Sequence, residues 1–218
     1  MTSTDVLEAI HELYEKNTDY PVTGEEDFDA RLSLVRASVR KWQNEINNGT
    51  LWKELFEPLS STMTTSDQAD APADWLAPGG SLWIGSTEYK YVRPERARQT
   101  VKTDPTARIY WLTGNRPAVK INVNPAPGAG VAFETDYYRE AFSPVTGDEA
   151  TELEMSSPYF VVYDVLTQLY IDDENTIQAD FNLNLANEQM SGMKMANEST
   201  PLFQPNGFDS LEEDGFGT

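Results

Sequence analysis

The sequence predicts an α+β protein: a four-helix bundle formed by a helix pair at each end of the chain, with a β-rich insertion between the pairs and an extended C-terminal tail. Three observations support this fold class. Apolar residues recur at helical spacing within residues 1–58 and again within 146–197. Residues 59–145 instead contain short β-branched and aromatic runs between prolines and glycines. Residues 198–218 are acidic and contain no lysine or arginine.

Two amphipathic segments predict the first helix pair. The first segment is expected to begin at Ser3 or Thr4, whose hydroxyl can cap a helix, and to end near Asn17. A loop that carries Pro21 and Gly24 separates it from a longer helix. The apolar residues of this longer helix step by four and three positions alternately and are Phe28, Leu32, Val35, Val39, Trp42 and Ile46. Such a seam faces a single partner surface.

The middle segment, residues 59–145, is expected to form strands rather than helices, because turn residues interrupt it throughout. The runs that fit strands are Ser81–Ile84, Thr87–Val92, Arg108–Leu112, Val119–Val123 and Val131–Tyr138. Gly114 and Asn115 lie between two of these runs and predict a hairpin.

The second helix pair begins after Ser156 or Ser157, either of which can cap a helix. Apolar residues cover most of the circumference of its first helix, so this helix is expected at the centre of the bundle. The second helix should run from about Asn175 to near Asn197. Because a β-rich segment separates the two pairs, the economical arrangement is one bundle from which that segment projects.

The tail, residues 198–218, combines acidic residues with large apolar ones. The apolar residues are costly to leave in water, so we expect the tail to dock on another chain. The candidate interface residues in it are Leu202, Phe203, Phe208, Leu211 and Phe216.

The charge of the chain is its outlying bulk property. Sixteen basic and 36 acidic side chains give a formal net charge of −20, which opposes nonspecific binding to nucleic acid or to an anionic membrane. There is no cysteine, so disulfides and thiolate chemistry are excluded. The N-terminus is polar and no apolar run is long enough for a bilayer, so we expect neither a signal peptide nor a membrane-spanning segment.

The sequence predicts no catalytic residue, no cofactor and no metal site. His11 is the only histidine, and we interpret it as a surface residue because His11 and Glu15 alone would make a weak metal site. No Gly-x-Ser-x-Gly or phosphate-binding glycine motif is present. The acidic run 172–174 lacks EF-hand spacing and fits a helix cap better. A small hydrolase with a carboxylate pair remains an alternative, since such pairs form in space rather than in sequence.

One basic cluster stands out in this acidic chain. Its members are Arg93, Arg96, Arg98 and Lys102, and the nearby aromatic residues are Trp83, Tyr89 and Tyr91. A nucleic-acid surface would combine such residues. We favour a basic strand edge that pairs with the acidic surface of a neighbouring copy.

The order of these segments resembles a known protein family. The segments that carry the resemblance are 31–46 with its aromatic exit 51–56, the hairpin region 110–138, and the closing helices 157–166 and 173–195. Together they are similar to the head-to-tail connector, or adaptor, proteins that bind beneath the portal of tailed bacteriophages.

The resemblance implies a structural role in the virion. Such adaptors form a homo-oligomeric ring, commonly of twelve subunits, which docks on the portal protein, contacts the next neck or tail protein and continues the DNA channel. An acidic lumen would repel passing DNA without recognising its sequence. The implied location is the virion neck after synthesis in the bacterial cytoplasm. Another neck or tail protein, a stopper or a tail-completion protein, is the alternative within this class and would be richer in β-structure.

Overall fold

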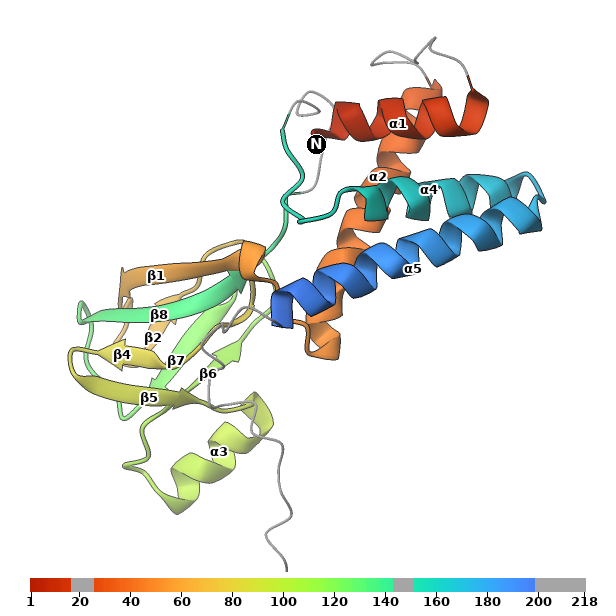
Figure 1. Ribbon diagram of the computed structural model, residues 1–218. Coiled ribbons are helices and arrows are strands. Elements are labelled where there is room, and N and C mark those ends of the chain that lie inside the picture. The colour runs from red at the N-terminus through yellow and green to blue at the C-terminus, as the bar shows by residue number, and fades with distance from the viewer. Residues whose placement is uncertain (17–25, 143–150, 199–218) are drawn as a thin grey trace, which may run out of the picture. The chain divides into compact units, whose positions relative to one another are not determined.

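The computed structural model of the protein describes residues 1–16, 26–142 and 151–198 (Figure 1). The chain divides into two compact units. The first, here called the helical unit, consists of Met1–Glu54 and Ala141–Thr200. The second, here called the β unit, consists in the described chain of Leu55–Glu140.

The helical unit contains four α-helices: α1 (Ser3–Glu15), α2 (Glu26–Asn44), α4 (Tyr159–Asp172) and α5 (Thr176–Glu198). The short 3-10 helix η1 (Glu45–Asn48) extends α2, and η2 (Lys53–Leu55) leads out of the unit. The periodicity-based predictions of these four α-helices are confirmed to within a few residues. A capping box starts α1, in which Asp5 N–H donates to the Thr2 hydroxyl at 3.1 Å and Thr2 N–H donates to the Asp5 carboxylate at 2.7 Å.

Helix α4 lies at the centre of the helical unit, as its apolar circumference predicts, and contacts α1, α2 and α5. Its one buried carboxylate, Asp164, is only 3% exposed. The Ser38 hydroxyl donates to this carboxylate at 2.6 Å, and Lys41 forms an ion pair with it. Since Ser38 and Lys41 belong to α2, these contacts fix α4 to α2 and satisfy a charge that would otherwise be costly to bury.

The β unit contains an eight-stranded, nearly closed sheet that resembles a barrel. Its strands are β1 (Phe56–Thr62), β2 (Gln68–Asp70), β3 (Trp75–Pro78), β4 (Leu82–Ile84), β5 (Thr87–Tyr91), β6 (Ile109–Thr113), β7 (Lys120–Asn124) and β8 (Ala132–Arg139). The strand order is β1-β8-β4-β5-β6-β7-β2, with β3 also paired to β8. The predicted hairpin around Gly114 is confirmed, because β6 and β7 pair in antiparallel fashion.

The sheet encloses a core of its own, rich in aromatic residues. Trp75 stacks on Tyr137 with ring centroids 4.9 Å apart, and Tyr110 is fully buried. The Tyr110 hydroxyl donates to the Gly80 carbonyl at 2.5 Å, so the buried phenol is satisfied. Burial raises the pKa of Tyr110 and keeps it neutral.

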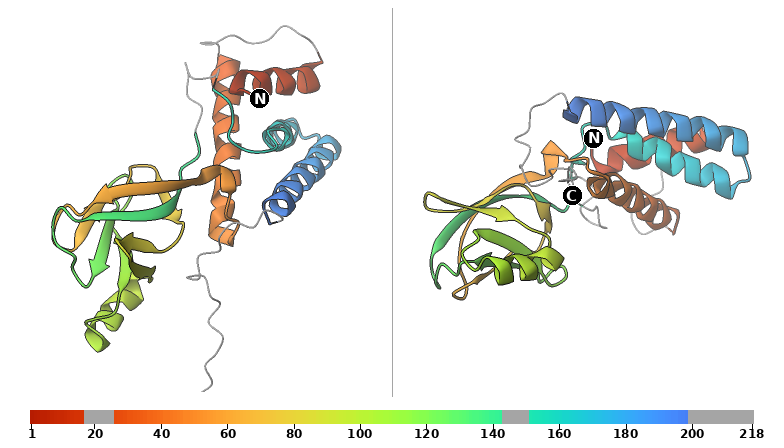
Figure 2. Two further views of the ribbon diagram at one scale, coloured as in Figure 1. Left: turned by 60° about the vertical axis from the view of Figure 1, so that its left-hand side comes forward. Right: turned by 90° about the horizontal axis from the view of Figure 1, so that it is seen from below.

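The predicted fold class, a four-helix bundle with a β insertion, is wrong. The protein is mixed α/β, and its large eight-stranded sheet has a core of its own and is not a small insertion into a helical bundle. The helices also do not align as a bundle: α4 and α5 run side by side, whereas α2 crosses them (Figures 1 and 2). A helix that is apolar on most sides, as α4 is, accepts partners from several directions and does not require one common axis.

The expectation of strands alone in residues 59–145 is also wrong. Residues Pro94–Thr103 form helix α3, which packs on β6 and buries Ala97 completely. Pro94 occupies the first turn, where proline favours a helix, so it starts α3 instead of interrupting one. Strands β5 and β6 pair in parallel, which requires a crossover connection between them, and α3 provides it.

We predict that Asp164→Ala destabilises the helical unit. Loss of the carboxylate leaves the buried Ser38 hydroxyl without its acceptor, which should lower the free energy of unfolding by about 2 kcal/mol. Urea denaturation followed by the helical circular dichroism signal measures this change. Asp172→Ala, at an exposed position, is the control and should leave the transition in place. Equal transitions for the two variants would contradict the role given to Asp164.

We predict that Gly79→Ala destabilises the β unit. A Cβ atom at this position would lie 2.8 Å from the Asp136 carbonyl carbon and 2.9 Å from the Tyr137 nitrogen, both backbone atoms of β8. Such overpacking should cost about 1–3 kcal/mol. At Gly80 the nearest atom is a side-chain oxygen at 3.8 Å, so Gly80→Ala is a matched control. Amide hydrogen exchange in β8 should accelerate in the first variant alone, and similar exchange in both would refute this packing argument.

Candidate functional site

The predicted surface position of His11 is wrong, because its side chain is buried and only 3% exposed. Arg31, also buried, donates from Nη1 to His11 Nδ1 at 2.6 Å and forms an ion pair with Glu15. An arginine only donates, so His11 Nδ1 is the acceptor of this hydrogen bond. His11 therefore joins α1 to α2 and has a structural part in the helical unit. The residues next to His11 in sequence are mostly acidic, so the sequence did not predict that Arg31, from another helix, would contact it.

A metal-binding cluster is not formed by the described residues: no group of three or more histidines and carboxylates lies together. The acidic run 172–174 lies where α4 passes into α5, but the cap that the sequence predicted there is made by Asn175, whose side chain accepts from Gln178 N–H at 3.3 Å. Within the acidic run, Asp173 accepts the Tyr14 hydroxyl at 2.5 Å and so contacts α1. The hydrogen bond to Asp173 and partial burial raise the pKa of Tyr14 to about 12.

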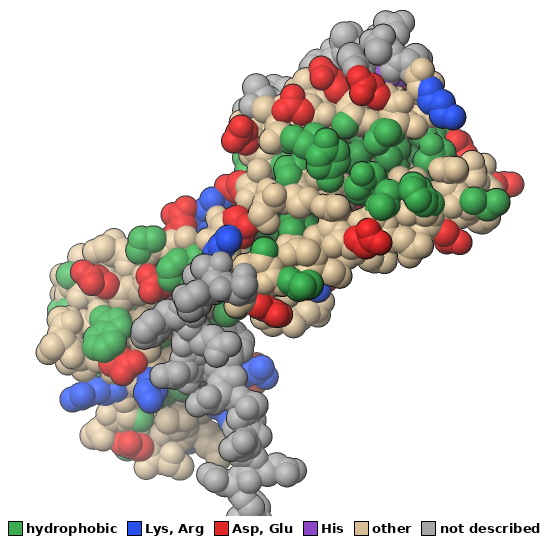
Figure 3. Space-filling model, viewed as in Figure 1, with side chains coloured by type: hydrophobic (Ala, Val, Ile, Leu, Met, Phe, Trp, Pro, Cys, Tyr) green, Lys and Arg blue, Asp and Glu red, His purple; other side chains and the backbone are tan. Residues whose placement is uncertain are grey.

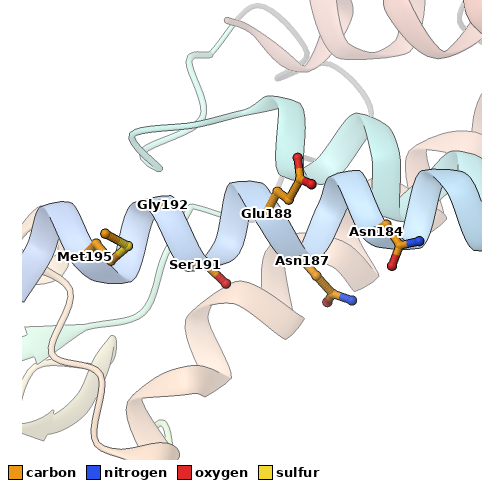
Figure 4. A pocket seen from close by; sticks show the side chains of 6 residues that line it. All are labelled: Asn184, Asn187, Glu188, Ser191, Gly192 and Met195. Carbon is orange, nitrogen blue, oxygen red and sulfur yellow. The ribbon is translucent and has the colours of Figure 1, made fainter.

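A shallow groove that is largely open to solvent lies along α5, and Figure 4 shows the side chains that line it. Its lining residues all come from this helix and are Asn184, Asn187, Glu188, Ser191, Gly192 and Met195. The groove contains one carboxylate and no second titratable group, so it lacks a pair for acid and base catalysis. Its amides and its exposed Met195 suit a protein contact better.

Large apolar side chains lie on the surface where α4 ends and α5 begins. Ile171 is 60% exposed, Ile177 is 79% exposed and Phe181 is 59% exposed. The exposed carboxylates here are Asp172 at the end of α4, Glu174 in the turn and Asp180 in α5. We call these six residues the α4–α5 tip. Figure 3 shows further hydrophobic side chains over α4, with acidic side chains around them.

The α4–α5 tip has no cation nearby in the sequence. Residues 140–193 contain no lysine or arginine. By sequence the helical unit has 22 acidic and seven basic side chains, which gives a net charge of −15. An exposed apolar surface with an acidic border is typical of a protein docking site.

The predicted basic residues Arg93, Arg96, Arg98 and Lys102 lie on or directly before α3 and are all exposed. Helical spacing places Arg98 and Lys102 on one side of α3 and Arg96 on the other, so they surround the exposed part of the helix. Lys90 and Arg108 on either side are exposed as well. We call these six residues the α3 basic surface. Residues 90–108 contain six basic and two acidic side chains, so this segment has a net charge of +4. Figure 3 shows lysine and arginine side chains at several separate places on the visible face of the β unit.

The α3 basic surface has no ion pair with any residue that the structure describes. The other three cations of the β unit are all paired, in the contacts Arg116–Glu140, Lys120–Asp70 and Arg139–Glu57. The predicted strand edge is wrong, since the residues lie on a helix. Sequence reasoning also omitted Lys90 and Arg108, although the charge count of the segment could have found them.

The aromatic residues near this basic surface do not form a stacking platform. Tyr89 is 6% exposed and belongs to the core of the β unit. Tyr91 is half-buried, and burial raises its pKa. Only Trp83, on β4, exposes a large part of its ring, at 43%. The candidate residues Leu202, Phe203, Phe208, Leu211 and Phe216 lie outside the described residues.

Comparison with known proteins identifies no relative: no protein-family model matches the chain, and no curated protein matches its sequence. Within the described part of the chain, every helix is too short or too polar to cross a membrane.

We predict that Asp173→Ala lowers the pKa of Tyr14 from about 12 towards the ordinary value of 10.0, because the hydrogen bond to Asp173 is its largest cause. The pKa is raised in the folded state, so the stabilisation is complete below pH 10 and is lost as the pH rises towards 12. A titration of phenolate ultraviolet absorbance measures the change. Asp172→Ala serves as the control, and an identical titration of both variants would exclude the contact.

Proposed function

We propose that this protein is a structural adaptor of a tailed bacteriophage, a ring protein that docks on the portal and links the capsid to the tail while continuing the DNA channel. The single observation that carries the proposal is the pair of unmatched surfaces: an exposed apolar, acidic tip on the helical unit, and a basic surface on the β unit that has no ion pair with the described residues. A subunit whose role is assembly needs such surfaces. The resemblance of segment order to the adaptor family supports the same role.

The chemistry of the described residues supports binding over catalysis. The buried polar contacts around His11 and Asp164 join helices to one another and do not line an open site. The groove on α5 contains a single carboxylate. The strongly acidic composition suits a channel wall along which DNA moves without adhering.

Helix content favours the adaptor over a stopper or tail-completion protein. Those proteins would be β-rich throughout, whereas the described part of this chain has five α-helices of 10 to 23 residues. Far-ultraviolet circular dichroism should therefore show a strong helical signal in solution, and a spectrum dominated by β-structure would favour the alternative.

Assembly on a portal is the decisive test of the proposed function. The purified chain should form a closed ring when mixed with portal rings from a tailed phage that encodes it, and native mass measurement with electron microscopy should detect the joint complex. A chain that neither forms rings nor binds the portal would refute the adaptor function.

We also predict a role for the apolar, acidic tail in that assembly. Truncation after Thr200 removes Leu202, Phe203, Phe208, Leu211 and Phe216, whose burial on a partner would contribute to binding. The truncated chain should keep its melting temperature but bind the portal at least about tenfold more weakly, since burying two or three such side chains is worth more than 1.4 kcal/mol. Replacing the four tail acids by their amides is the control for charge. Unchanged portal binding after truncation would exclude the tail from the interface.

A further inference from the structure

We propose that the α3 basic surface of one copy binds the α4–α5 tip of the next copy, and that this contact joins the subunits of the ring. The inference deepens the proposed function and rests on it, because it names the surfaces through which copies meet. The two surfaces differ, so the contact is heterologous. Repeated contacts of that type generate a ring when the rotation closes and an open chain when it does not.

The first step of the argument is the charge imbalance of the β unit. It has ten acidic and nine basic side chains, a net charge of −1, although the whole protein has a charge of −20. Six of those nine cations lie in the α3 basic surface and have no carboxylate partner among the described residues. An uncompensated cluster of this kind attracts an anionic surface from another molecule.

The second step is the match in chemistry at the α4–α5 tip. Arginine can lay its aliphatic stem on apolar surface while its guanidinium pairs with a carboxylate. The tip offers both partners, since Ile177 and Phe181 are more than half exposed and Asp180 lies between them in sequence. On α5 these residues occupy neighbouring positions at i, i+3 and i+4, which share one face of a helix.

The third step identifies the occupant as a second copy of this chain. The acidic helical unit, at −15, and the basic segment 90–108, at +4, belong to the same sequence, so every copy brings both halves of a complementary pair. A nucleic acid could neutralise the basic surface but would leave Ile171, Ile177 and Phe181 exposed. It would also meet the repulsion of a molecule with a net charge of −20.

Charge reversal on each side tests the contact directly. The double variant Arg96→Glu with Arg98→Glu should weaken self-association at least about tenfold, because acidic side chains would then face the acidic tip. Glu174→Lys with Asp180→Lys should do the same from the other side. All four positions are exposed, so melting temperatures should stay close to that of the parent.

Mixing the two reversed variants separates pairing from a general charge effect. Each reversed surface meets its complement on the other variant, so the mixture should recover association to near the parental level. A chain with all four substitutions should recover it as well. The matched control is Arg116→Glu with Lys120→Glu, which changes the net charge of the β unit equally but lies outside the α3 basic surface.

Association is measured by analytical ultracentrifugation and mass photometry, with and without portal rings. Rings that form normally in both reversed variants would overturn this inference and leave the adaptor function intact. A parent chain that forms no oligomer under either condition would overturn both. Binding of duplex DNA is measured by fluorescence polarisation. The inference fails, and the partner of α3 is nucleic acid, if three results are found together: the parent binds DNA, the Arg96 and Arg98 double variant does not, and assembly of that variant is unchanged.

Discussion

The helical unit depends on the burial of α4. This helix has buried residues on nearly every side, and only contacts with several other helices can keep them from water. Its partners α1 and α2 come from the start of the chain, whereas α5 follows it directly. The two ends of the chain must therefore meet before α4 is covered. Asp164 also fixes which side of α4 faces α2, because its buried carboxylate is paired only when Ser38 and Lys41 of α2 lie against it.

The same requirement explains why residues 55–140 form a separate unit. The chain leaves the helical unit after Glu54 and returns at Ala141, so everything between must bury its own apolar residues. It does so with aromatic rings inside a curved sheet, where Trp75, Tyr110 and Phe133 are fully buried. Strand β1 lies at one end of the strand order and pairs only with β8, which is why it tolerates Pro58 in its middle.

Periodicity predicted the local elements well and their assembly poorly. The apolar spacing from Phe28 to Ile46 was sufficient to locate α2, and the run Val131–Tyr138 to locate β8. Helix α3 was missed because its apolar side is small, with Ala97 buried and Val101 partly buried one turn later, and because prolines at its start and just after its end indicated turns. Strands β1 to β3 were missed in a serine- and threonine-rich stretch with prolines. Crossing directions and the His11–Arg31 contact depend on residues distant in sequence, which no local pattern encodes.

The placement of charge cannot be explained by the stability of the fold. An exposed ion pair is worth about 0–1 kcal/mol. Folding alone therefore gives little reason to leave six cations of one segment without an ion pair to any described residue when the other three of the β unit are paired. Their mutual repulsion is a small cost to the isolated unit. The exposed Ile177 and Phe181 are a second such cost, because water contacts surface that packing could bury. Contact between the α3 basic surface of one copy and the α4–α5 tip of another would remove both the charge repulsion and the exposure of apolar side chains. Association between copies therefore explains both features.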